Sequence, residues 1–186
     1  MKEIMKKHVN IEILDEDELV FLNGGTSAAG VDKILKGLKD FIEQLQLSFL
    51  GGESMLVGSK VSKIINKVSD FCKSNNIFFS VHFTTNGTML PKIVLESIKN
   101  ITTNFQITID GSKEQHNKVR GSKSFDSYER IWQHIHTLNE SLKDCYFSLR
   151  INYDSETFKD MKGIINDILG LHINNDKVVI SLKKVW

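Results

Sequence analysis

Proline and cysteine are both scarce in this sequence of 186 residues, which contains one proline and two cysteines. Because proline ends or kinks helices and strands, a single Pro91 favours long uninterrupted elements. The two cysteines, Cys72 and Cys145, stand far apart in the chain. Such isolated cysteines are interpreted as reduced, small buried hydrophobic residues, and no metal site is predicted from them.

Long apolar runs are also missing. No segment approaches the roughly 20 consecutive apolar residues that a membrane-spanning helix needs. The charged start of the chain is followed by no apolar stretch of the kind found in a signal peptide, so we expect a cytoplasmic protein. The net charge is only +1, and the sequence has no dense basic cluster. Neither nucleic acid nor a membrane surface is therefore expected as a partner.

Apolar residues recur along the chain in segments that suit a β-strand and in segments with a helical period, and the two kinds of segment alternate. β-type segments are expected at 9–14, 46–50, 77–83, 105–109, 146–152 and 177–182. Helical segments are expected at 31–45, 60–73, 90–99, 124–142 and 155–171, with Ser155 as an N-cap. Strict alternation predicts an α/β fold with parallel strands, either as an open doubly wound sheet or as part of a barrel.

Polar and glycine-containing segments follow several of the expected strands. Gly51, Gly52 and Glu53 follow the second strand, Asn86 follows the third, and Asp110 ends the fourth. Any one such segment is ordinary turn chemistry. Ligands of parallel α/β folds, however, bind at the carboxyl ends of the strands, where these segments gather. Charged residues at the ends of apolar strands therefore indicate a small-molecule site.

Three segments together resemble a known family. LSFLGGES at 47–54 is similar to the FxGGEP motif of radical S-adenosylmethionine enzymes, and FTTNGTML at 83–90 is similar to their TNGTLL segment. ITIDGSKEQHNKVRG followed by SFDSYERI, within 107–131, resembles the long SIDG block of SPASM-type enzymes, the peptide- and anaerobic sulfatase-maturing or arylsulfatase regulator-like group. The resemblance implies a partial (βα)6 TIM-like barrel, with residues 1–186 as a single core domain.

The resemblance also implies roles for individual residues. Gly51, Gly52 and Glu53 would contact the amino group of S-adenosylmethionine, since glycines admit close backbone approach and a carboxylate pairs with an ammonium. Thr108 and Arg120 would contact the methionine carboxylate.

Three further residues are weaker candidates. Asn86 and Asp110 would line the rim toward ribose or substrate. Arg150 would either face the site or pair with a neighbouring carboxylate, Asp110 or Glu53. No catalytic residue is assigned.

The chain departs from the family where the cluster should be bound. Family members carry CxxxCxxC after the first strand, and these cysteines hold a [4Fe-4S] cluster. Here that region reads NGGTSAAG at 23–30, and no cysteine precedes Cys72. The cluster loop is therefore expected to be missing, and so is the C-terminal auxiliary domain. A smaller departure is Ser54, which replaces the proline of GGEP.

Three functional hypotheses follow. The first is a radical S-adenosylmethionine core domain whose cluster loop has been removed, inactive as written, from an oxidoreductase that matures peptides or sulfatases. The second is a natural pseudo-enzyme of the same fold that binds a peptide or partner protein in a maturation system. The third is a (βα) barrel that binds a nucleotide or another small molecule without radical chemistry. S-adenosylmethionine is a possible cofactor, and the [4Fe-4S] cluster that the family implies has no ligands here.

Overall fold

The computed structural model describes residues 7–13, 35, 42–51, 53–121, 125–155 and 157–185. Six strands form one sheet, and every neighbouring pair is parallel. They are β1 (Lys7–Ile13), β2 (Ile42–Phe49), β3 (Phe78–Thr85), β4 (Thr102–Asp110), β5 (Cys145–Tyr153) and β6 (Val178–Lys184).

The strands lie side by side in the order in which they occur in the chain. A doubly wound sheet reverses its strand order at a switch point, whereas a barrel adds each strand next to the last. The sequential order therefore resolves the choice that periodicity left open. The fold is the expected partial (βα)6 barrel with parallel strands.

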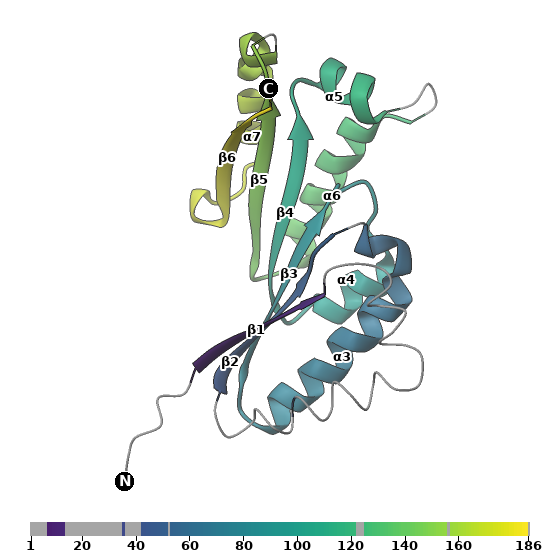
Figure 1. The fold of residues 1–186 in the computed structure, drawn as a ribbon, viewed down its shortest axis with the longest axis vertical. Helices are drawn as coiled ribbons and strands as arrows, with labels where there is room; N and C mark the ends of the chain where they lie inside the picture. Colours follow the sequence, from purple (N-terminus) through teal and green to yellow (C-terminus); the bar gives the residue numbers. More distant parts are fainter. Residues whose placement is uncertain are drawn as a thin grey trace.

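Helices follow the strands along the chain and cover one face of the sheet (Figure 1). The α-helices are α3 (Gly58–Ser74), α4 (Lys92–Ile98), α5 (Lys113–Arg120), α6 (Ser127–Ser141) and α7 (Met161–Gly170). Three short 3-10 helices are η1 (Ser54–Val57), η2 (Thr157–Asp160) and η3 (Asn175–Lys177). Among these described helices, none is long and apolar enough to cross a bilayer.

A row of four phenylalanines forms the centre of the core. Phe49, Phe83, Phe105 and Phe147 occupy directly paired positions on β2 to β5. Their rings stack with centroids 5.1, 5.1 and 6.4 Å apart, and all four are buried. They belong to one cluster with the apolar stripes of α3, α4 and α6. This face of the sheet therefore packs against the helices.

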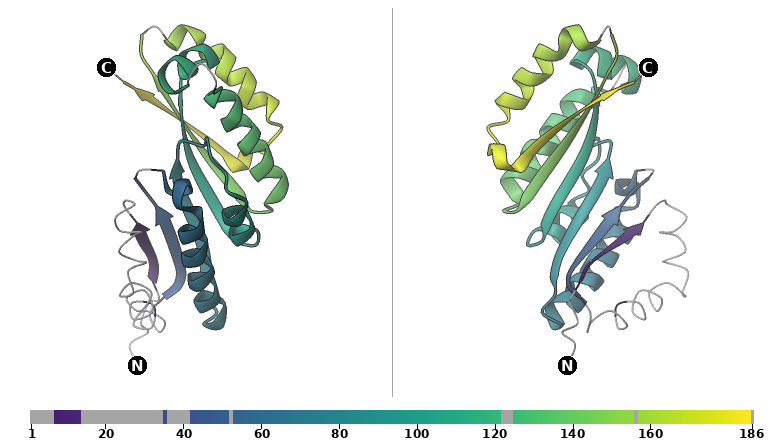
Figure 2. Two further views of the ribbon diagram at one scale, coloured as in Figure 1. Left: turned by 90° about the vertical axis from the view of Figure 1, so that its right-hand side faces the viewer. Right: turned by 60° about the vertical axis from the view of Figure 1, so that its left-hand side comes forward.

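The opposite face, which we call the open face, is polar. It is turned toward the viewer on the right of Figure 2. Its residues alternate with the buried ones along β2 to β5 and include Gln46, Ser48, Ser80, His82, Thr84, Thr102, Asn104, Gln106, Thr108, Asp110, Ser148, Arg150 and Asn152. Branched apolar side chains usually fill the interior of a (βα) barrel. A polar interior face is instead suited to a polar ligand.

Several expected boundaries were wrong. The helix expected at 31–45 runs too far, because β2 begins at Ile42 and pairs with β1 and β3. The apolar spacing of Ile42 and Leu45 suits a helix, but sheet pairing overrides it. Of the remainder of that segment, the structure describes Leu35, which is helical and buried. Residues 14–34, including the NGGTSAAG segment at 23–30 where the cluster loop is expected to be missing, lie outside the described residues.

The last expected helix also begins later than its sequence suggested. Ser155 is exposed and does not cap it. Asp154 instead accepts a hydrogen bond from the backbone N–H of Thr157 at 2.7 Å, which starts η2, and α7 follows at Met161. The helix expected at 124–142 is confirmed as α6, which begins at Ser127. Phe125 precedes it and is 37% exposed, with the Arg130 guanidinium over its ring.

The stacked row predicts a large stability effect at its centre. Phe105→Ala should lower the free energy of unfolding by about 3–5 kcal/mol, because it leaves a cavity between two stacked rings. Phe78→Ala is the matched control, since Phe78 is 53% exposed on β3. Urea denaturation measures both. Equal losses of unfolding free energy in the two variants would show that the stacked row does not contribute specially to the stability of the core.

Candidate functional site

Glu53 ties the end of β2 to the end of β3. Its carboxylate accepts hydrogen bonds from the hydroxyl of Thr85 at 2.8 Å and from the backbone N–H of Asn86 at 2.9 Å. It also accepts from the backbone N–H of Met55 at 3.2 Å, which starts η1. Glu53 is only 8% exposed. Nearby Gly51 has φ +80°, a left-handed conformation that favours glycine.

The turn after β3 is folded on itself. The Asn86 side-chain oxygen accepts from the backbone N–H and the hydroxyl of Thr88, at 2.9 and 2.6 Å. Gly87 has φ +74°, and a Cβ there would lie 3.0 Å from Cγ2 of Ile107. The carbonyl of Gly87 also bonds to the His134 ring of α6 at 2.9 Å. The turn thus needs glycine both for its backbone conformation and for its close contact with β4.

Asp110, the last residue of β4, is the centre of a second group of contacts. One carboxylate oxygen accepts from Nε of Arg120 at the end of α5. The other accepts from Nδ2 of Asn152 on β5 at 2.6 Å. The backbone N–H of Asp110 donates to Nδ1 of His116 at 3.1 Å. Asp110 therefore joins β4, β5 and α5 at the carboxyl end of the sheet.

Thr108 and Arg150 lie opposite each other on β4 and β5, on the open face one layer below Asp110. Both side chains are half-buried. Among the described residues, no ion pair involves Arg150. The carboxylate of Asp110 pairs with Arg120 instead, and that of Glu53 bonds to uncharged donors. Arg150 is thus not engaged by either carboxylate proposed for it.

His116 is fully buried beneath Asp110 and packs edge-on against Tyr128, with ring centroids 5.8 Å apart. Its Nδ1 accepts a hydrogen bond, so its proton sits on Nε2. Burial lowers the pKa of His116, and the nearby Arg120 guanidinium lowers it further, while the carboxylates of Asp110 and Asp126 oppose the shift. His116 is therefore neutral at physiological pH.

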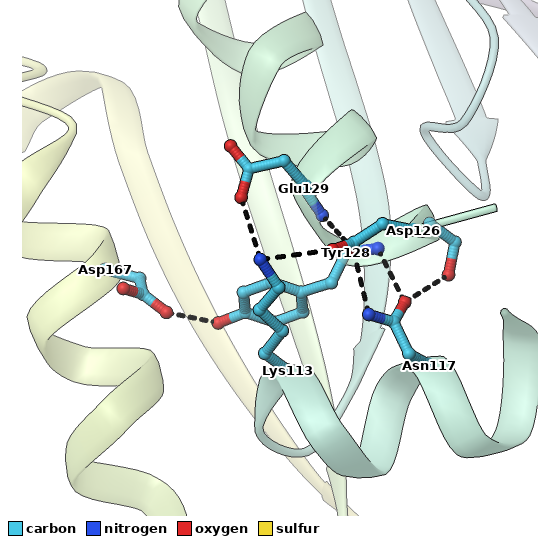
Figure 3. Close-up of polar contacts among 7 residues, drawn as sticks. Lys113, Asn117, Asp126, Tyr128, Glu129 and Asp167 are labelled. Atoms are coloured by element: carbon cyan, nitrogen blue, oxygen red, sulfur yellow. Dashed lines mark hydrogen bonds and ion pairs between the residues drawn. The ribbon is translucent and has the colours of Figure 1, made fainter. Parts of the chain in front are cut away.

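A polar network outside the sheet holds α5 in place (Figure 3). Lys113 of α5 pairs with Asp126 and Glu129, each at 3.1 Å. Asn117 donates to the Asp126 carboxylate at 2.8 Å. The Tyr128 hydroxyl donates to Asp167 of α7 at 2.5 Å. Because α5 carries Arg120, this network fixes the helix that brings the guanidinium to the strand ends.

Asp126 is the N-cap of α6 as well as a member of this network. The backbone N–H of Glu129 and the Asn117 amide lower the pKa of Asp126 to about 2. The carboxylate is thus ionised across the physiological range. It links the start of α6 to α5 through Lys113 and Asn117.

The structure brings most of the expected site residues to one edge of the sheet. Glu53 and Asn86 are hydrogen-bonded to each other, as are Asp110 and Arg120. Gly52 lies outside the described residues. The sequence analysis did not single out Thr85, although it is a buried polar residue within the TNG-like segment. It also missed the whole of α5, because Lys113–Arg120 has too few apolar residues to show a helical period.

The cysteines do not fit an iron–sulfur cluster. Cys72 lies in the last turn of α3 and Cys145 begins β5, so both are at the edge of the sheet opposite the site. Burial raises the pKa of Cys72 to about 11 and that of Cys145 to about 12, whereas cluster ligands are thiolates. Within the described ranges, no group of three or more His, Cys, Asp or Glu side chains is arranged to hold a metal ion.

Family and structure comparisons agree on the class of protein. A family model described as "4Fe-4S single cluster domain" matches residues 20–132, more than half of the chain. The chain therefore belongs to the 4Fe-4S single cluster domain family. No curated protein matches the sequence significantly.

Solved structures of anSMEcpe, an anaerobic sulfatase-maturing enzyme, share the fold. The native enzyme with bound AdoMet and Cp18Cys peptide has a TM-score of 0.57 and 17% identity, covering 81% of this chain and 40% of that one. The hexahistidine-tagged enzyme with bound AdoMet has a TM-score of 0.58 and 17% identity, covering 82% and 39%.

The chain thus spans about two fifths of the length of these structures. The resemblance to radical S-adenosylmethionine enzymes of the sulfatase-maturing type, drawn from the sequence, is confirmed.

The buried His116 predicts a pH-dependent stability. Its pKa is lowered in the folded protein, so below the ordinary histidine pKa of 6.5 the unfolded chain takes up a proton that the folded chain does not. The free energy of unfolding should therefore fall as the pH drops below about 6.5. His116→Asn retains a hydrogen-bond acceptor for Asp110 without titrating, and should reduce this dependence in urea denaturation between about pH 7.5 and about pH 5.5.

The matched control is His136→Asn, on the exposed side of α6. It should leave the pH dependence as in the wild type. His82 on the open face also has a pKa lowered by burial, so a smaller slope should persist in the His116 variant. An unchanged slope in His116→Asn would contradict the assignment of a neutral buried histidine.

Proposed function

We propose that this chain is a radical S-adenosylmethionine-type core domain that binds S-adenosylmethionine at the carboxyl ends of its strands without cleaving it. The observation that carries the proposal is the environment of Arg120. Its Nε is held by Asp110, and in the part of the chain that the structure describes no hydrogen bond engages its Nη atoms. A planar guanidinium with two open Nη groups is the preferred partner of a ligand carboxylate.

Other atoms at the same edge suit the rest of the methionine end. The buried Glu53 carboxylate lies beside Asn86, and a carboxylate attracts an ammonium group. Among the described residues, none donates a hydrogen bond to the buried Oδ1 atom of Asn152. Buried polar atoms are nearly always satisfied, so this oxygen is suited to a donor on a ligand. Thr108 lies on the open face, as Asn152 does, and has a hydroxyl that can bond to the ligand.

Binding and radical chemistry are separate in this proposal. Bound S-adenosylmethionine supplies a sulfonium-activated 5′ carbon, and its reductive cleavage needs an electron from a cluster. The described cysteines are buried at the opposite edge and do not supply thiolate ligands. The proposed role of this chain is therefore to bind and orient, with residues 1–186 forming one core domain and the cluster loop missing near 23–30.

A second candidate function is supported by the open face. Its uncharged hydroxyl, amide and imidazole groups form hydrogen bonds without demanding a charged partner. One of the similar anSMEcpe structures holds a bound Cp18Cys peptide. We infer that a peptide or partner protein is the ligand of this face, as in a pseudo-enzyme that assists maturation. This function does not require cofactor cleavage.

S-adenosylmethionine binding tests the first proposal. Isothermal titration of the wild type should show binding, and Arg120→Ala should weaken it by about 10- to 100-fold, because a charge-assisted hydrogen bond contributes about 1.5–3 kcal/mol. Arg130→Ala is the control, since Arg130 is an exposed arginine on α6 that lies over Phe125. No binding by the wild type would remove the proposal, and tight binding of an unrelated nucleotide instead would favour a non-radical barrel.

Iron content tests the proposed lack of cleavage. After anaerobic reconstitution with iron and sulfide, the desalted protein should retain far less than one cluster per chain, because the chain offers no set of three cysteines. Incubation with dithionite and S-adenosylmethionine should yield no 5′-deoxyadenosine above a protein-free control. A stoichiometric cluster with product formation would show that the domain is active.

A further inference from the structure

The guanidinium of Arg120 is held at one end only. Asp110 accepts from Nε, and among the described residues no hydrogen bond engages the two Nη groups. The Arg120 side chain is 37% exposed, whereas that of Asp110 is 15% exposed. One edge of the guanidinium is therefore fixed to the sheet, and the other edge remains accessible.

Asp110 is itself held by two contacts besides Arg120. Asn152 on β5 donates to one oxygen at 2.6 Å, and the backbone N–H of Asp110 bonds to His116 at 3.1 Å. His116 is fully buried, so this anchor belongs to the core. The Asp110 carboxylate thus has a defined orientation before any ligand arrives, and it passes that orientation to Arg120.

We propose that Asp110 is a positioning residue for Arg120 and does not contact the ligand. The Asp110 carboxylate fixes Nε of Arg120. The two Nη groups are then already oriented to donate two parallel hydrogen bonds to the carboxylate of the ligand. A free arginine side chain has many rotamers, and the entropy of those rotamers must otherwise be lost when the ligand binds. This inference rests on the proposed function, because it assigns the ligand carboxylate to Arg120.

The opposite role makes the opposite prediction. If Asp110 were an internal competitor that occupies Arg120 in place of the ligand, removing its charge would release the guanidinium and tighten binding. The geometry favours positioning, because Asp110 engages Nε and leaves the Nη edge to a bidentate partner. The sign of the change in affinity therefore decides between the two roles.

The experiment compares two ligands. S-adenosylmethionine carries the carboxylate, and 5′-methylthioadenosine retains the nucleoside but lacks both the carboxylate and the amine. In isothermal titration, Asp110→Asn should lower the affinity for S-adenosylmethionine by about tenfold. The affinity for 5′-methylthioadenosine should stay within about twofold of the wild-type value. Asn152→Ala, which removes the donor to Asp110 together with the buried Oδ1, should lower the affinity for S-adenosylmethionine in the same direction by about threefold. The two variants reach the same network from different strands, so the test does not depend on one of them folding.

Two controls separate positioning from a general loss of structure. Lys118→Ala removes an exposed cation of the same helix α5 and should change neither affinity. In an Arg120→Ala background, Asp110→Asn should cause no further loss, because a residue that acts through Arg120 has no effect without it. A further loss in that background would show that Asp110 acts independently, and would overturn the inference.

The remaining outcomes are also decisive. Unchanged or tighter S-adenosylmethionine binding by Asp110→Asn overturns positioning while leaving the proposed function intact. An equal loss of affinity for both ligands would show that Asp110 contacts the nucleoside or supports the fold. That outcome also overturns the positioning role. A wild type that binds S-adenosylmethionine no better than 5′-methylthioadenosine removes the carboxylate site itself, and with it both proposals.

Discussion

Parallel pairing in strict chain order is the constraint on which the candidate site depends. The register places Phe83 opposite Phe105 and Phe105 opposite Phe147, and further along β4 and β5 it places Asp110 opposite Asn152. Because strand side chains alternate, the register that stacks the phenylalanines beneath the helices also turns Thr108 and Asp110 to the open face. A slip of one residue would bury the polar set and expose the rings. The apolar core and the polar site are thus consequences of one register.

Two acidic residues connect the carboxyl ends of the strands, and they do so in different ways. Glu53 binds neutral donors from the end of β3 and fixes the spacing between two strand ends. Asp110 binds one cation and one amide, and fixes β4 relative to β5 and α5. Hydrogen bonds to a buried carboxylate are strong because the surroundings screen them less than water does. The positions of potential ligand-binding groups are therefore set by contacts that exist without a ligand.

The sequence predicted the sheet better than it predicted the site. Alternating periods identified all six strands, and the GGE-, TNG- and SIDG-like segments located the strand ends. Strand order itself is a long-range property that no local period encodes, so the choice between open sheet and barrel needed the structure. The start of β2 was missed for the same reason, because Ile42 and Leu45 fit a helix locally.

The partner of Asp110 could not be read from the sequence either. Arg150 was the natural candidate, since it lies on the neighbouring strand and near the same layer. The actual partner, Arg120, is delivered by α5, a helix of eight residues whose only buried side chain is His116. Such a helix forms through packing and through the Lys113 and Asn117 network, rather than through an amphipathic period. Its position therefore depends on tertiary contacts that propensity does not report.

The missing cluster ligands bear on which side chains at the strand ends would contact S-adenosylmethionine. The resemblance implies that in active relatives the cluster iron binds the amino and carboxylate groups of S-adenosylmethionine. Under the proposed function, this chain, whose sequence has no set of three cysteines, would satisfy those two groups with protein side chains. Glu53 is largely buried, and its carboxylate already accepts three donors, so the carboxylate end of the ligand must contribute most to recognition. In that proposal the affinity depends on how well the Arg120 guanidinium is oriented, and Asp110 is the carboxylate that holds it.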